Sequence, residues 1–356
     1  MTSSQKLQVA VIGASGYGGA ELVRLLAGHP QAEVALATAS GERAGAKISD
    51  LFPSLRGICD VACEEFDLER IASTCDFAFL ALPHGKAMEI VPPLLERGIK
   101  VCDLGADFRL RDVAVYQEWY KLPHSACSTL QEAVYGLPEW NREPIKKARL
   151  VANPGCYPTS AILALAPLVA ADIIERDSII VDSASGTSGA GRSSFGLGMH
   201  HPEVSGDYKA YNVGSHRHTP EIEQALNDAS GKTAAPLHIT FTAHLLPIAR
   251  GILSTSYATL RQPLDTASVQ RVIAERYTAE PFVRVHPAGE LPQIKHIVGS
   301  NFCDIGVKVD TRTNRVIVIS AEDNLVKGAA GQAIQNMNLM CGFEETTSLH
   351  GAPVFP

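Results

Sequence analysis

The sequence lacks the features that mark membrane proteins and nucleic-acid-binding proteins. No stretch approaches the roughly 20 consecutive apolar residues that cross a bilayer, and the formal net charge is −7 rather than positive. General binding to nucleic acid or to an anionic membrane requires a basic surface, so we expect neither as a partner. Repeats, low-complexity tracts and long charge runs are also missing. With 46% hydrophobic and 19% charged residues among 356, the chain is typical of a globular protein with two domains.

The eight cysteines lack the spacing of a zinc site. Cys59 and Cys63 are four residues apart, but no second pair follows at the spacing that zinc sites use. Residues 1–6 lead straight into a strand-like run, without the separate apolar region of a signal peptide. We therefore expect free thiols and a reducing, cytoplasmic location.

The first part of the chain, to about residue 150, alternates between strand-like and helix-like segments. Apolar runs of strand length are separated by segments with helical spacing of apolar residues, such as Gly18–Gly28 and Lys86–Glu96. This alternation predicts a parallel sheet with helices on both faces, a Rossmann-like α/β domain over residues 1–155. The predicted strands are Leu7–Ile12, Glu33–Ala39, Asp76–Leu82, Lys100–Asp103 and Arg149–Ala152.

The pattern changes after about residue 155. Thr159–Ala171 is predicted to form one apolar helix, and longer runs rich in β-branched residues follow it. We expect a mixed sheet backed by helices, an α+β catalytic and oligomerisation domain over residues 156–323. A last helix from about Asn324 to Met340 is expected to complete the first domain, over residues 324–343. The predicted strands are Ser178–Ser183, Leu237–His244, Ile252–Leu260, Phe302–Val309 and Val316–Ala321, and the predicted helices between them are Glu221–Asn227 and Thr266–Tyr277.

A glycine-rich segment follows the first predicted strand and opens the first predicted helix. Gly13–Gly19 has the spacing G-x-x-G-x-x-G. Glycines allow a tight turn and let backbone N–H groups approach a pyrophosphate, which then faces the positive end of the helix. A glycine-rich turn without a ligand is the alternative, but the position between a strand and a helix favours a dinucleotide site. The residues predicted to contact this cofactor are Gly13, Ser15, Gly16, Tyr17 and Gly18.

The end of the second predicted strand indicates which dinucleotide binds. An NAD site usually has a carboxylate there, which binds the ribose 2′-hydroxyl. Here Thr38 and Ser40 occupy that region, and the cations Arg43 and Lys47 follow. Hydroxyls and cations suit a 2′-phosphate, so NADP(H) is favoured over NAD, although Glu42 could serve as the ribose acid if the strand is longer. A solvated loop is the alternative interpretation of the two cations.

Cys156 lies at the junction of the two predicted domains, in the segment Asn153–Thr159. Pro158 suits the first turn of the following helix, so Cys156 is expected just before a helix N-terminus. The helix dipole favours the thiolate there, Gly155 removes bulk beside the sulfur, and backbone N–H groups of the turn could hold an oxyanion. A buried structural cysteine is the alternative. We interpret Cys156 as a nucleophile.

The densest polar cluster of the chain is Gly214–Ile222. Thr219 is expected to cap a helix whose positive end disfavours an imidazolium at His218, which would leave a neutral base. If the segment before it is extended, His216 and His218 point to the same side, so one could move a proton while the other binds substrate and Glu221 orients them. A zinc site and an inert capped helix are the alternatives. An enzyme that uses a thiolate and hydride transfer needs no metal, and we predict none.

Arginines near two loops are candidates for binding an anionic substrate. Asp103–Arg111 leaves the end of a predicted strand, where ligands bind in α/β sheets. Ser185–Arg192 is a second loop of glycines and hydroxyls that could cradle a phosphate or carboxylate. Guanidinium groups bind such oxyanions bidentately, and an ordinary surface arginine is the alternative in each case. The candidates are Arg109, Arg111 and Arg192.

Six segments carry a family resemblance. They are GASGYGGAEL at 13–22, DLGADFRL at 103–110, NPGCYPT at 153–159, SGTSGAGR at 185–192, HRHTPEI at 216–222 and the stretch 323–338. NPGCYPT and HRHTPEI together are specific. With these motifs spread over nearly its whole length, the chain resembles the N-acetyl-γ-glutamyl-phosphate reductases of arginine biosynthesis.

The resemblance implies a fold like that of aspartate-semialdehyde dehydrogenase, with a second domain like that of glyceraldehyde-3-phosphate dehydrogenase, and a homodimer or homotetramer. It implies Cys156 as the active-site cysteine and a role for the segment His216–His218. It also implies a helix that starts at Asn324 and returns to the nicotinamide. The residues assigned on the matching motifs are Ser185 and Gly186 for the cofactor, and Asn153 and His216 for the substrate.

The expected activity is NADPH-dependent reduction of N-acetyl-γ-glutamyl phosphate to N-acetylglutamate semialdehyde, with release of phosphate and a thioester on Cys156. The nearest alternative is the same chemistry on aspartyl phosphate or on a carrier-linked aminoadipyl phosphate. HRHTPEI favours the glutamyl substrate over the aspartyl one and does not exclude the carrier-linked one. A non-catalytic NADP-binding regulator is an alternative of another class, but it would need neither Cys156 nor His218.

Overall fold

The structure is a computed structural model that describes residues 6–194, 196–231 and 236–354. It divides into two compact units. The first comprises Met1–Pro154, Gly191–Ser193 and Ala329–Gly351, and the second comprises Gly155–Ala190, Ser194–Gly328 and Ala352–Pro356. The division after Pro154 differs by one residue from the expected boundary. The segment that completes the first unit is Ala329–Gly351 instead of the expected 324–343, and Gly191–Ser193 also belongs to the first unit.

Seven strands form the sheet of the first unit, and every neighbouring pair is parallel. The strand order is β3-β2-β1-β4-β5-β7-β6. It begins as the 3-2-1-4-5 order of dinucleotide-binding sheets, in which ligands bind beyond the carboxyl ends of the strands where the order reverses. The strands are β1 (Leu7–Ile12), β2 (Ala32–Thr38), β3 (Cys63–Glu64), β4 (Phe77–Leu80), β5 (Lys100–Asp103), β6 (Val134–Tyr135) and β7 (Leu150–Ala152).

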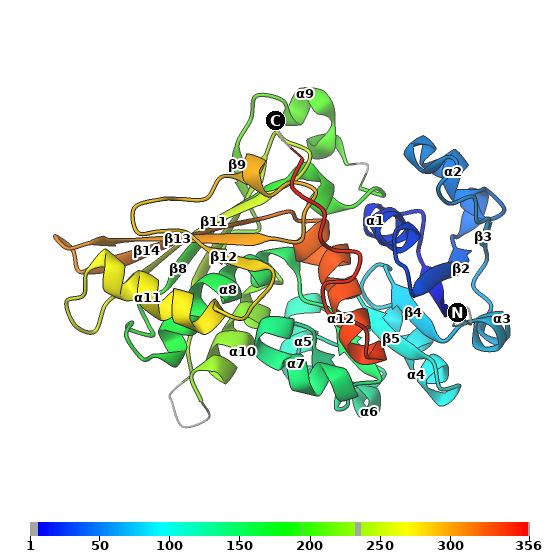
Figure 1. Ribbon diagram of the computed structural model, residues 1–356, viewed down its shortest axis with the longest axis horizontal. Helices are drawn as coiled ribbons and strands as arrows, with labels where there is room; N and C mark the ends of the chain where they lie inside the picture. The colour runs from blue at the N-terminus through cyan, green and yellow to red at the C-terminus, as the bar shows by residue number, and fades with distance from the viewer. Residues whose placement is uncertain (1–5, 195, 232–235, 355–356) are drawn as a thin grey trace. The chain divides into compact units, whose positions relative to one another are not determined.

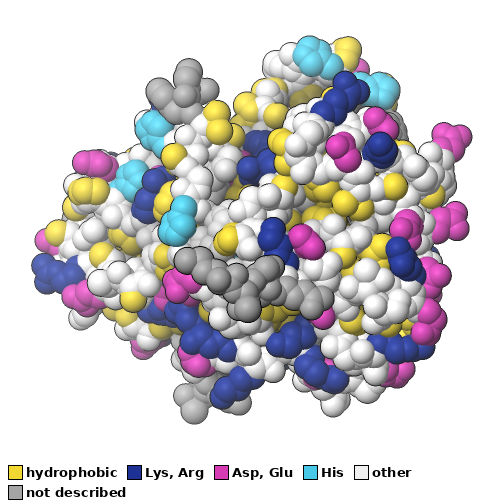
Figure 2. All heavy atoms as spheres, turned by 45° about the vertical axis from the view of Figure 1, so that its right-hand side comes forward, with side chains coloured by type: hydrophobic (Ala, Val, Ile, Leu, Met, Phe, Trp, Pro, Cys, Tyr) yellow, Lys and Arg dark blue, Asp and Glu magenta, His cyan; other side chains and the backbone are white. Residues whose placement is uncertain are grey.

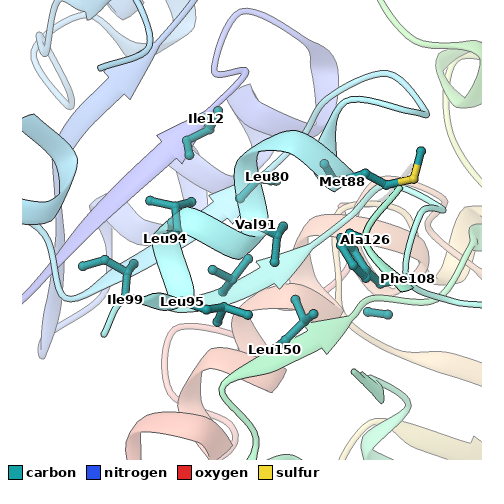
Figure 3. Packing of buried hydrophobic residues seen from close by; sticks show 14 of the residues in the cluster. Ile12, Leu80, Met88, Val91, Leu94, Leu95, Ile99, Phe108, Ala126 and Leu150 are labelled. Atoms are coloured by element: carbon teal, nitrogen blue, oxygen red, sulfur yellow. The ribbon is translucent and has the colours of Figure 1, made fainter. Parts of the chain in front are cut away.

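Apolar side chains cover both faces of this sheet. Ala10 and Ile12 of β1 belong to a buried cluster with side chains of α4 (Ala87–Glu96), among them Val91 and Leu94 (Figure 3). Val9 and Val11 alternate with them and are also fully buried, as expected for a strand between two helical layers. The other helices before residue 150 are α1 (Tyr17–Ala27), α2 (Ile48–Leu51), α3 (Leu68–Thr74), α5 (Val113–Tyr120), α6 (Cys127–Leu130) and α7 (Pro138–Lys147).

The carboxyl-terminal helix α12 (Gly331–Cys341) packs against α1, α7 and β5 of the first unit. It appears in red in Figure 1. The sequence predicted one continuous helix from Asn324, and this is wrong. A π-helical turn, Val326–Ala330, comes first, because the Asp323 carbonyl oxygen accepts a hydrogen bond from Gly328 N five residues later, at 3.0 Å.

The sheet of the second unit is mixed, as expected, with the order β12-β13-β14-β11-β8-β10-β9. β8 and β10 are parallel, while β11, β14 and β13 form an antiparallel run beside them. The helices α8, α10 and α11 lie on one face of it (Figure 1). The elements are β8 (Ile180–Gly186), β9 (Lys209–Tyr211), β10 (Thr240–Leu246), β11 (Ile252–Thr259), β12 (Val283–Val285), β13 (Cys303–Asp310), β14 (Arg315–Glu322), α8 (Cys156–Ala170), α9 (His201–Val204), α10 (Thr219–Ala229) and α11 (Thr266–Tyr277).

The central helix α8 is buried from Tyr157 to Val169. A chain of buried hydroxyls joins it to three strands: Ser160 Oγ donates to Ser254 Oγ at 2.8 Å and contacts Ser320 Oγ at 2.8 Å, and Ser183 Oγ contacts Ser254 Oγ at 2.7 Å. These bonds satisfy polar groups that burial would otherwise penalise. They fix the rotation of the helix that begins at Cys156.

Candidate active site

The glycine loop between β1 and α1 is shaped by two of its glycines. Gly13 has a φ of +91°, and a Cβ there would lie 2.5 Å from the carbonyl oxygen of Ala81. A Cβ on Gly19 would lie 2.4 Å from Gly13 O and 2.6 Å from Ala14 Cα. Both approaches are far inside van der Waals contact, so these two positions require glycine to form the turn.

Gly16 and Gly18 are under no such constraint. A Cβ on Gly16 would meet only Gly13 O, at 3.6 Å, and one on Gly18 only a Leu104 methyl, at 3.9 Å. Gly16 is the N-cap of α1, and no side chain caps this end. The first N–H groups of the helix are therefore available to an anion, and the missing side chains leave room for one. Ser15 is half-buried and Tyr17 is 40% exposed at the same loop.

The candidate ribose-phosphate residues lie at the end of β2 and just beyond it. Thr38 is buried and holds the glycine loop: its carbonyl oxygen accepts from Ala14 N at 2.9 Å, and its Oγ1 accepts from Gly13 N at 3.3 Å. Ser40 is exposed and Arg43 half-buried, both with side chains near the surface. The structure thus gives Thr38 a supporting role in the loop and leaves Ser40 and Arg43 open to a ligand.

Arg192, expected at the substrate, lies in the first unit beside the glycine loop. Its Nη1 donates to Ser15 O at 3.0 Å, and its guanidinium carbon lies 4.5 Å from the centre of the Phe52 ring. Its Nη2 donates to Leu51 O at 3.4 Å. Arg192 therefore puts a cation beside the glycine loop within the first unit.

Arg109 and Asn153 are buried at the carboxyl ends of β5 and β7. Arg109 is 6% exposed and donates to Asn153 O at 2.8 Å and to Leu104 O at 2.7 Å. The Asn153 amide donates to Ala329 O at 3.1 Å and accepts from Asn336 Nδ2 at 3.0 Å. These bonds hold the segment before the nucleophile. Arg111 is exposed, and binding of substrate by the three residues stays a prediction.

Cys156 is the first residue of α8, not the residue before it as the sequence predicted. The side chain is half-buried. The peptide N–H that precedes it, on Gly155, donates to Glu221 Oε1 at 2.8 Å, and Glu221 is 1% exposed. The Gly155 carbonyl oxygen accepts from both Thr159 N and Thr159 Oγ1 at 3.0 Å. The turn that carries the thiol is thus fixed on both sides of Gly155, and the helix start favours a thiolate.

The two histidines meet at Tyr157, the residue that follows Cys156. The rings of His216 and His218 have centroids 4.9 Å apart, and both lie edge-on to Tyr157, at 5.5 and 5.9 Å. The predicted proximity of the rings is confirmed, but the reason is different. His218 has helical φ and ψ, so the segment is a turn rather than an extended strand.

The helix N-cap was also misplaced: His218 is the N-cap of α10 and Thr219 its first residue. His216 Nδ1 accepts a hydrogen bond from His218 N at 3.2 Å, which tightens the turn before the helix. An accepting Nδ1 carries a lone pair, so the ring proton of neutral His216 lies on Nε2. Burial, followed by the charge of Arg217, lowers the pKa of His216 to about 4.

Two tyrosines complete this cluster, and the sequence did not single them out. Tyr157 donates its hydroxyl hydrogen to the His244 carbonyl oxygen at 3.1 Å, so Tyr211 is the donor in the 2.9 Å contact between the two hydroxyls. Burial raises the pKa of Tyr211 to about 12 and raises that of Tyr157 as well. Neither ionises near neutral pH. A tyrosine directly after the candidate nucleophile was the only signal in the sequence.

Ser185, Gly186 and Asn324, assigned to the cofactor by resemblance, lie together in the second unit. Asn324 Oδ1 accepts from Gly251 N at 2.7 Å, and its amide donates to Ser188 Oγ at 2.9 Å. A Cβ on Gly186 would lie 2.8 Å from three backbone atoms of Ala249 and Arg250. These contacts join the loop after β8 to the loop before β11, and cofactor contact by the three residues stays a prediction.

Among the described residues, no three His, Cys, Asp or Glu side chains are grouped to hold a metal ion. No described helix is long and apolar enough to cross a membrane. On the face shown in Figure 2, lysine and arginine side chains are interspersed with aspartate and glutamate.

Two family models and several solved structures match this architecture. The NAD-binding domain of the semialdehyde dehydrogenases matches residues 8–148, and their dimerisation domain matches residues 156–324. Aspartate semialdehyde dehydrogenase II from Vibrio cholerae has a TM-score of 0.73 at 18% identity, over 95% of this chain and 99% of that one. The enzyme from Candida albicans, solved with NADP, has a TM-score of 0.70 at 17% identity, over the same shares. The fold is that of a semialdehyde dehydrogenase, which confirms the predicted fold class.

Comparison of the amino-acid sequence with known proteins identifies a family within this class of enzymes. N-acetyl-gamma-glutamyl-phosphate reductase from Pelotomaculum thermopropionicum is 56% identical over 98% of this chain and 99% of its own. The proteins of that name from Symbiobacterium thermophilum and Desulfotalea psychrophila are 53% and 54% identical over 98% of this chain, and 99% and 100% of their own. The chain belongs to the N-acetyl-gamma-glutamyl-phosphate reductase family, as the motifs predicted.

Proposed function

We propose that this chain catalyses the NADPH-dependent reduction of N-acetyl-γ-glutamyl phosphate to N-acetylglutamate semialdehyde, a step of arginine biosynthesis. The observation that carries the proposal is the position of Cys156, on the first turn of α8, with its preceding N–H held by the buried Glu221. The family's name supplies the substrate. A thiolate at a helix start and a nearby histidine pair are what acyl transfer to a thioester needs.

The residues of the first unit fit a dinucleotide with a 2′-phosphate. The uncapped start of α1 and the free space at Gly16 suit a pyrophosphate. Ser40, Arg43 and Arg192 provide a hydroxyl and two cations around the glycine loop and the end of β2. We therefore assign Arg192 to the nucleotide and favour NADP(H) over NAD.

The reaction begins at the sulfur. The Cys156 thiolate forms a bond to the acyl carbon of the substrate, and the bond from that carbon to the phosphate oxygen breaks, so phosphate leaves with the electron pair. The N–H of Gly155 is engaged by Glu221, so we assign stabilisation of the oxyanion of the tetrahedral intermediate to the positive N-terminal end of α8. The product of this half-reaction is a thioester on Cys156.

When bound at the first unit's glycine loop, NADPH would supply a hydride to the carbonyl carbon of this thioester. The carbonyl oxygen then carries the charge, and His218 protonates it and takes the proton back when the carbon–sulfur bond breaks. This step releases the semialdehyde and regenerates the thiolate. The proton consumed overall ends on the released phosphate. His216 is held neutral by burial, so it orients His218 and the substrate rather than donating the proton.

The reverse reaction tests the proposal. N-acetylglutamate semialdehyde, phosphate and NADP should generate NADPH absorbance, and the rate should fall to background without phosphate. Cys156→Ser should lower the rate by at least about 10³-fold while still binding NADPH. Aspartate semialdehyde should be a much poorer substrate. A rate independent of phosphate would contradict acyl-phosphate chemistry.

We further propose that two copies of the chain pair through the sheet of the second unit. Along β14, Val316, Val318 and Ser320 are buried beneath the helices, while Ile317 and Ile319 alternate with them and are only half-buried. The matching domain is named for dimerisation. Ile319→Asp should convert the dimer to monomers in sedimentation velocity. An unchanged sedimentation coefficient would place the interface elsewhere.

A further inference from the structure

Gly328, in the π-helical turn Val326–Ala330, lies directly against Cys156, and both residues belong to the second unit. A Cβ on Gly328 would be 2.8 Å from Cys156 Cβ and 3.2 Å from Cys156 Cα. It would also be 2.9 Å from Glu322 Oε1. Carbon atoms in folded proteins approach to about 3.5–4.0 Å, so no side chain fits at Gly328 without displacing one of these neighbours. Its φ is not in the left-handed region, so the position requires glycine for space and not for conformation.

The nucleophile side of this contact is firmly held. The peptide before Cys156 is fixed by Glu221 at Gly155 N and by Thr159 at Gly155 O. The next residue, Tyr157, is 2% exposed and bonded through its hydroxyl. Cys156 therefore has little freedom to move away, except by distorting the turn that orients its sulfur.

The opposite wall is also fixed. Glu322 ends β14, is paired with Ile252 and Cys303 of the adjacent strands, and has no exposed surface. The turn itself is pinned by the buried Asp323. Its carboxylate accepts from Leu325 N at 2.8 Å and from Gly299 N at 2.7 Å, and its carbonyl oxygen accepts from Gly328 N. π-Helical turns are uncommon and concentrate at functional sites.

We propose that Gly328 is a positioning residue for the nucleophile: the π-helical turn, with no side chain at this point, supports Cys156 from behind and sets where its sulfur lies. This role deepens the proposed function, since it concerns the same thiol. It requires only that Gly328 and the Cys156 carbons remain in contact, whichever acyl phosphate is the substrate.

Kinetics provide the first test. Gly328→Ala should lower kcat of the reverse reaction by about 10²-fold, since a displacement near 1 Å at the reacting atom has that effect. The rate of Cys156 alkylation by iodoacetamide should change by at least about threefold, and the KM for NADP by less than about twofold. Gly196→Ala is the matched control, because a Cβ there has nothing within 4 Å. A Gly328→Ala enzyme with kcat within threefold of the unchanged protein would overturn the proposal.

A double-mutant cycle tests the contact without using activity. Cys156→Gly removes the carbon that a Cβ at position 328 would strike first. The fall in melting temperature caused by Gly328→Ala should therefore be at least halved in the Cys156→Gly background. If Gly328→Ala alone does not fold, the double variant should recover folded protein. Equal losses in both backgrounds, or no recovery, would refute the role whether or not the unchanged protein reduces acyl phosphates.

Discussion

The two units build their parts of the chemistry from different material. In the first, the glycine loop offers main-chain N–H groups, and side chains serve to hold that main chain: Thr38 binds Gly13 N and Arg192 binds Ser15 O. In the second, the groups that we propose to react are side chains, and main-chain groups hold the side chains around them, as Gly155 N does for Glu221 and His218 N does for His216.

This contrast predicts how each site fails. A main-chain site depends on the glycines that let it form and tolerates changes around it. A side-chain site depends on packing among segments far apart in the chain, so a single truncation leaves a buried polar group without its partner, at a cost of about 1–3 kcal/mol. Changes in the second unit should therefore reduce turnover most, and changes in the first should reduce cofactor affinity.

Removing His218 should have the largest effect. His218→Asn is expected to lower kcat by about 10³-fold and to abolish one limb of the pH–rate profile, because it removes the proton carrier. His216→Asn should lower kcat by only about tenfold and keep both limbs, since burial holds the pKa of His216 at about 4. Rates from pH 5 to 9 separate the two. If His216→Asn is the variant that loses the limb, the assignment is reversed.

The lowered pKa of His216 also predicts how the free energy of unfolding changes with pH. The unfolded ring takes up a proton near pH 6.5, and the folded ring only near pH 4. Stability should therefore be full above pH 6.5 and fall as the pH drops toward 4, by up to about 3 kcal/mol. Denaturant unfolding at pH 7 and pH 5 should show a smaller loss for His216→Asn than for the unchanged protein.

Removing the Glu221 carboxylate should cause the next largest loss of turnover. Glu221→Ala leaves Gly155 N–H buried without its acceptor, so the turn that carries Cys156 loosens. We expect kcat to fall by about 10²-fold with the KM for NADP unchanged. Glu221→Gln keeps an accepting oxygen and should retain about tenfold more activity than the alanine variant. A large rise in the KM for NADP would indicate a general loss of structure rather than misplacement of the thiol.

Two substitutions in the glycine loop, Gly16→Ala and Gly19→Ala, form a matched pair that tests the main-chain site. Gly16→Ala should leave the melting temperature within about 1 °C, because its Cβ meets only Gly13 O at 3.6 Å. It should raise the dissociation constant for NADPH by about tenfold, since it fills the space intended for the pyrophosphate. Gly19→Ala should lower both stability and affinity. NADPH fluorescence and thermal melts measure both, and unchanged affinity in Gly16→Ala would move the nucleotide away from this loop.

Sequence patterns located the elements better than the contacts between them. β1, β5 and α11 have the predicted bounds because clear apolar periodicity and strong end signals agree there. Runs of two or three residues carry no periodicity. The sequence therefore did not predict the short strands β3, β6, β9 and β12. The π-helical turn was not predicted either, because the hydrogen bonds around Asp323 that stabilise it depend on residues brought together by folding.

Candidate site residues follow the same division. Gly13, Cys156 and the histidine pair could be proposed from the sequence because the chemistry expected of them is local to a motif. The tyrosine partners Tyr157 and Tyr211 were missed because their hydroxyls meet only when α8 and β9 approach each other. Arg192 was predicted at the substrate, and its position beside the glycine loop could not be foreseen, because nothing in the order of residues shows that Gly191–Ser193 folds back onto that loop.

The smallest effect is expected at a buried carboxyl in the sheet of the first unit to which the proposed reaction gives no role. Asp103, at the end of β5, accepts only from Gly105 N among the described groups, and burial, with the nearby charge of Asp107, raises its pKa to about 7. A raised carboxyl pKa means that the unfolded state ionises first. Its contribution to stability is therefore full below about pH 4 and lost as the pH rises through 7. Asp103→Asn should gain about 1–2 kcal/mol on the unchanged protein between pH 6 and pH 9, with turnover within about twofold.

Asp107 is the control for this prediction, because its carboxylate has the donors that Asp103 lacks. It accepts from Gly85 N at 2.8 Å, from Ala87 N at 3.0 Å and from the Tyr116 hydroxyl at 2.8 Å. Asp107→Asn should lose stability throughout the same range, since an amide replaces an acceptor of three hydrogen bonds. Urea melts at pH 6, 7.5 and 9 compare the pair. If both variants are destabilised equally at every pH, Asp103 is ionised in the folded protein, and a charge rather than a neutral acid lies at the carboxyl end of β5.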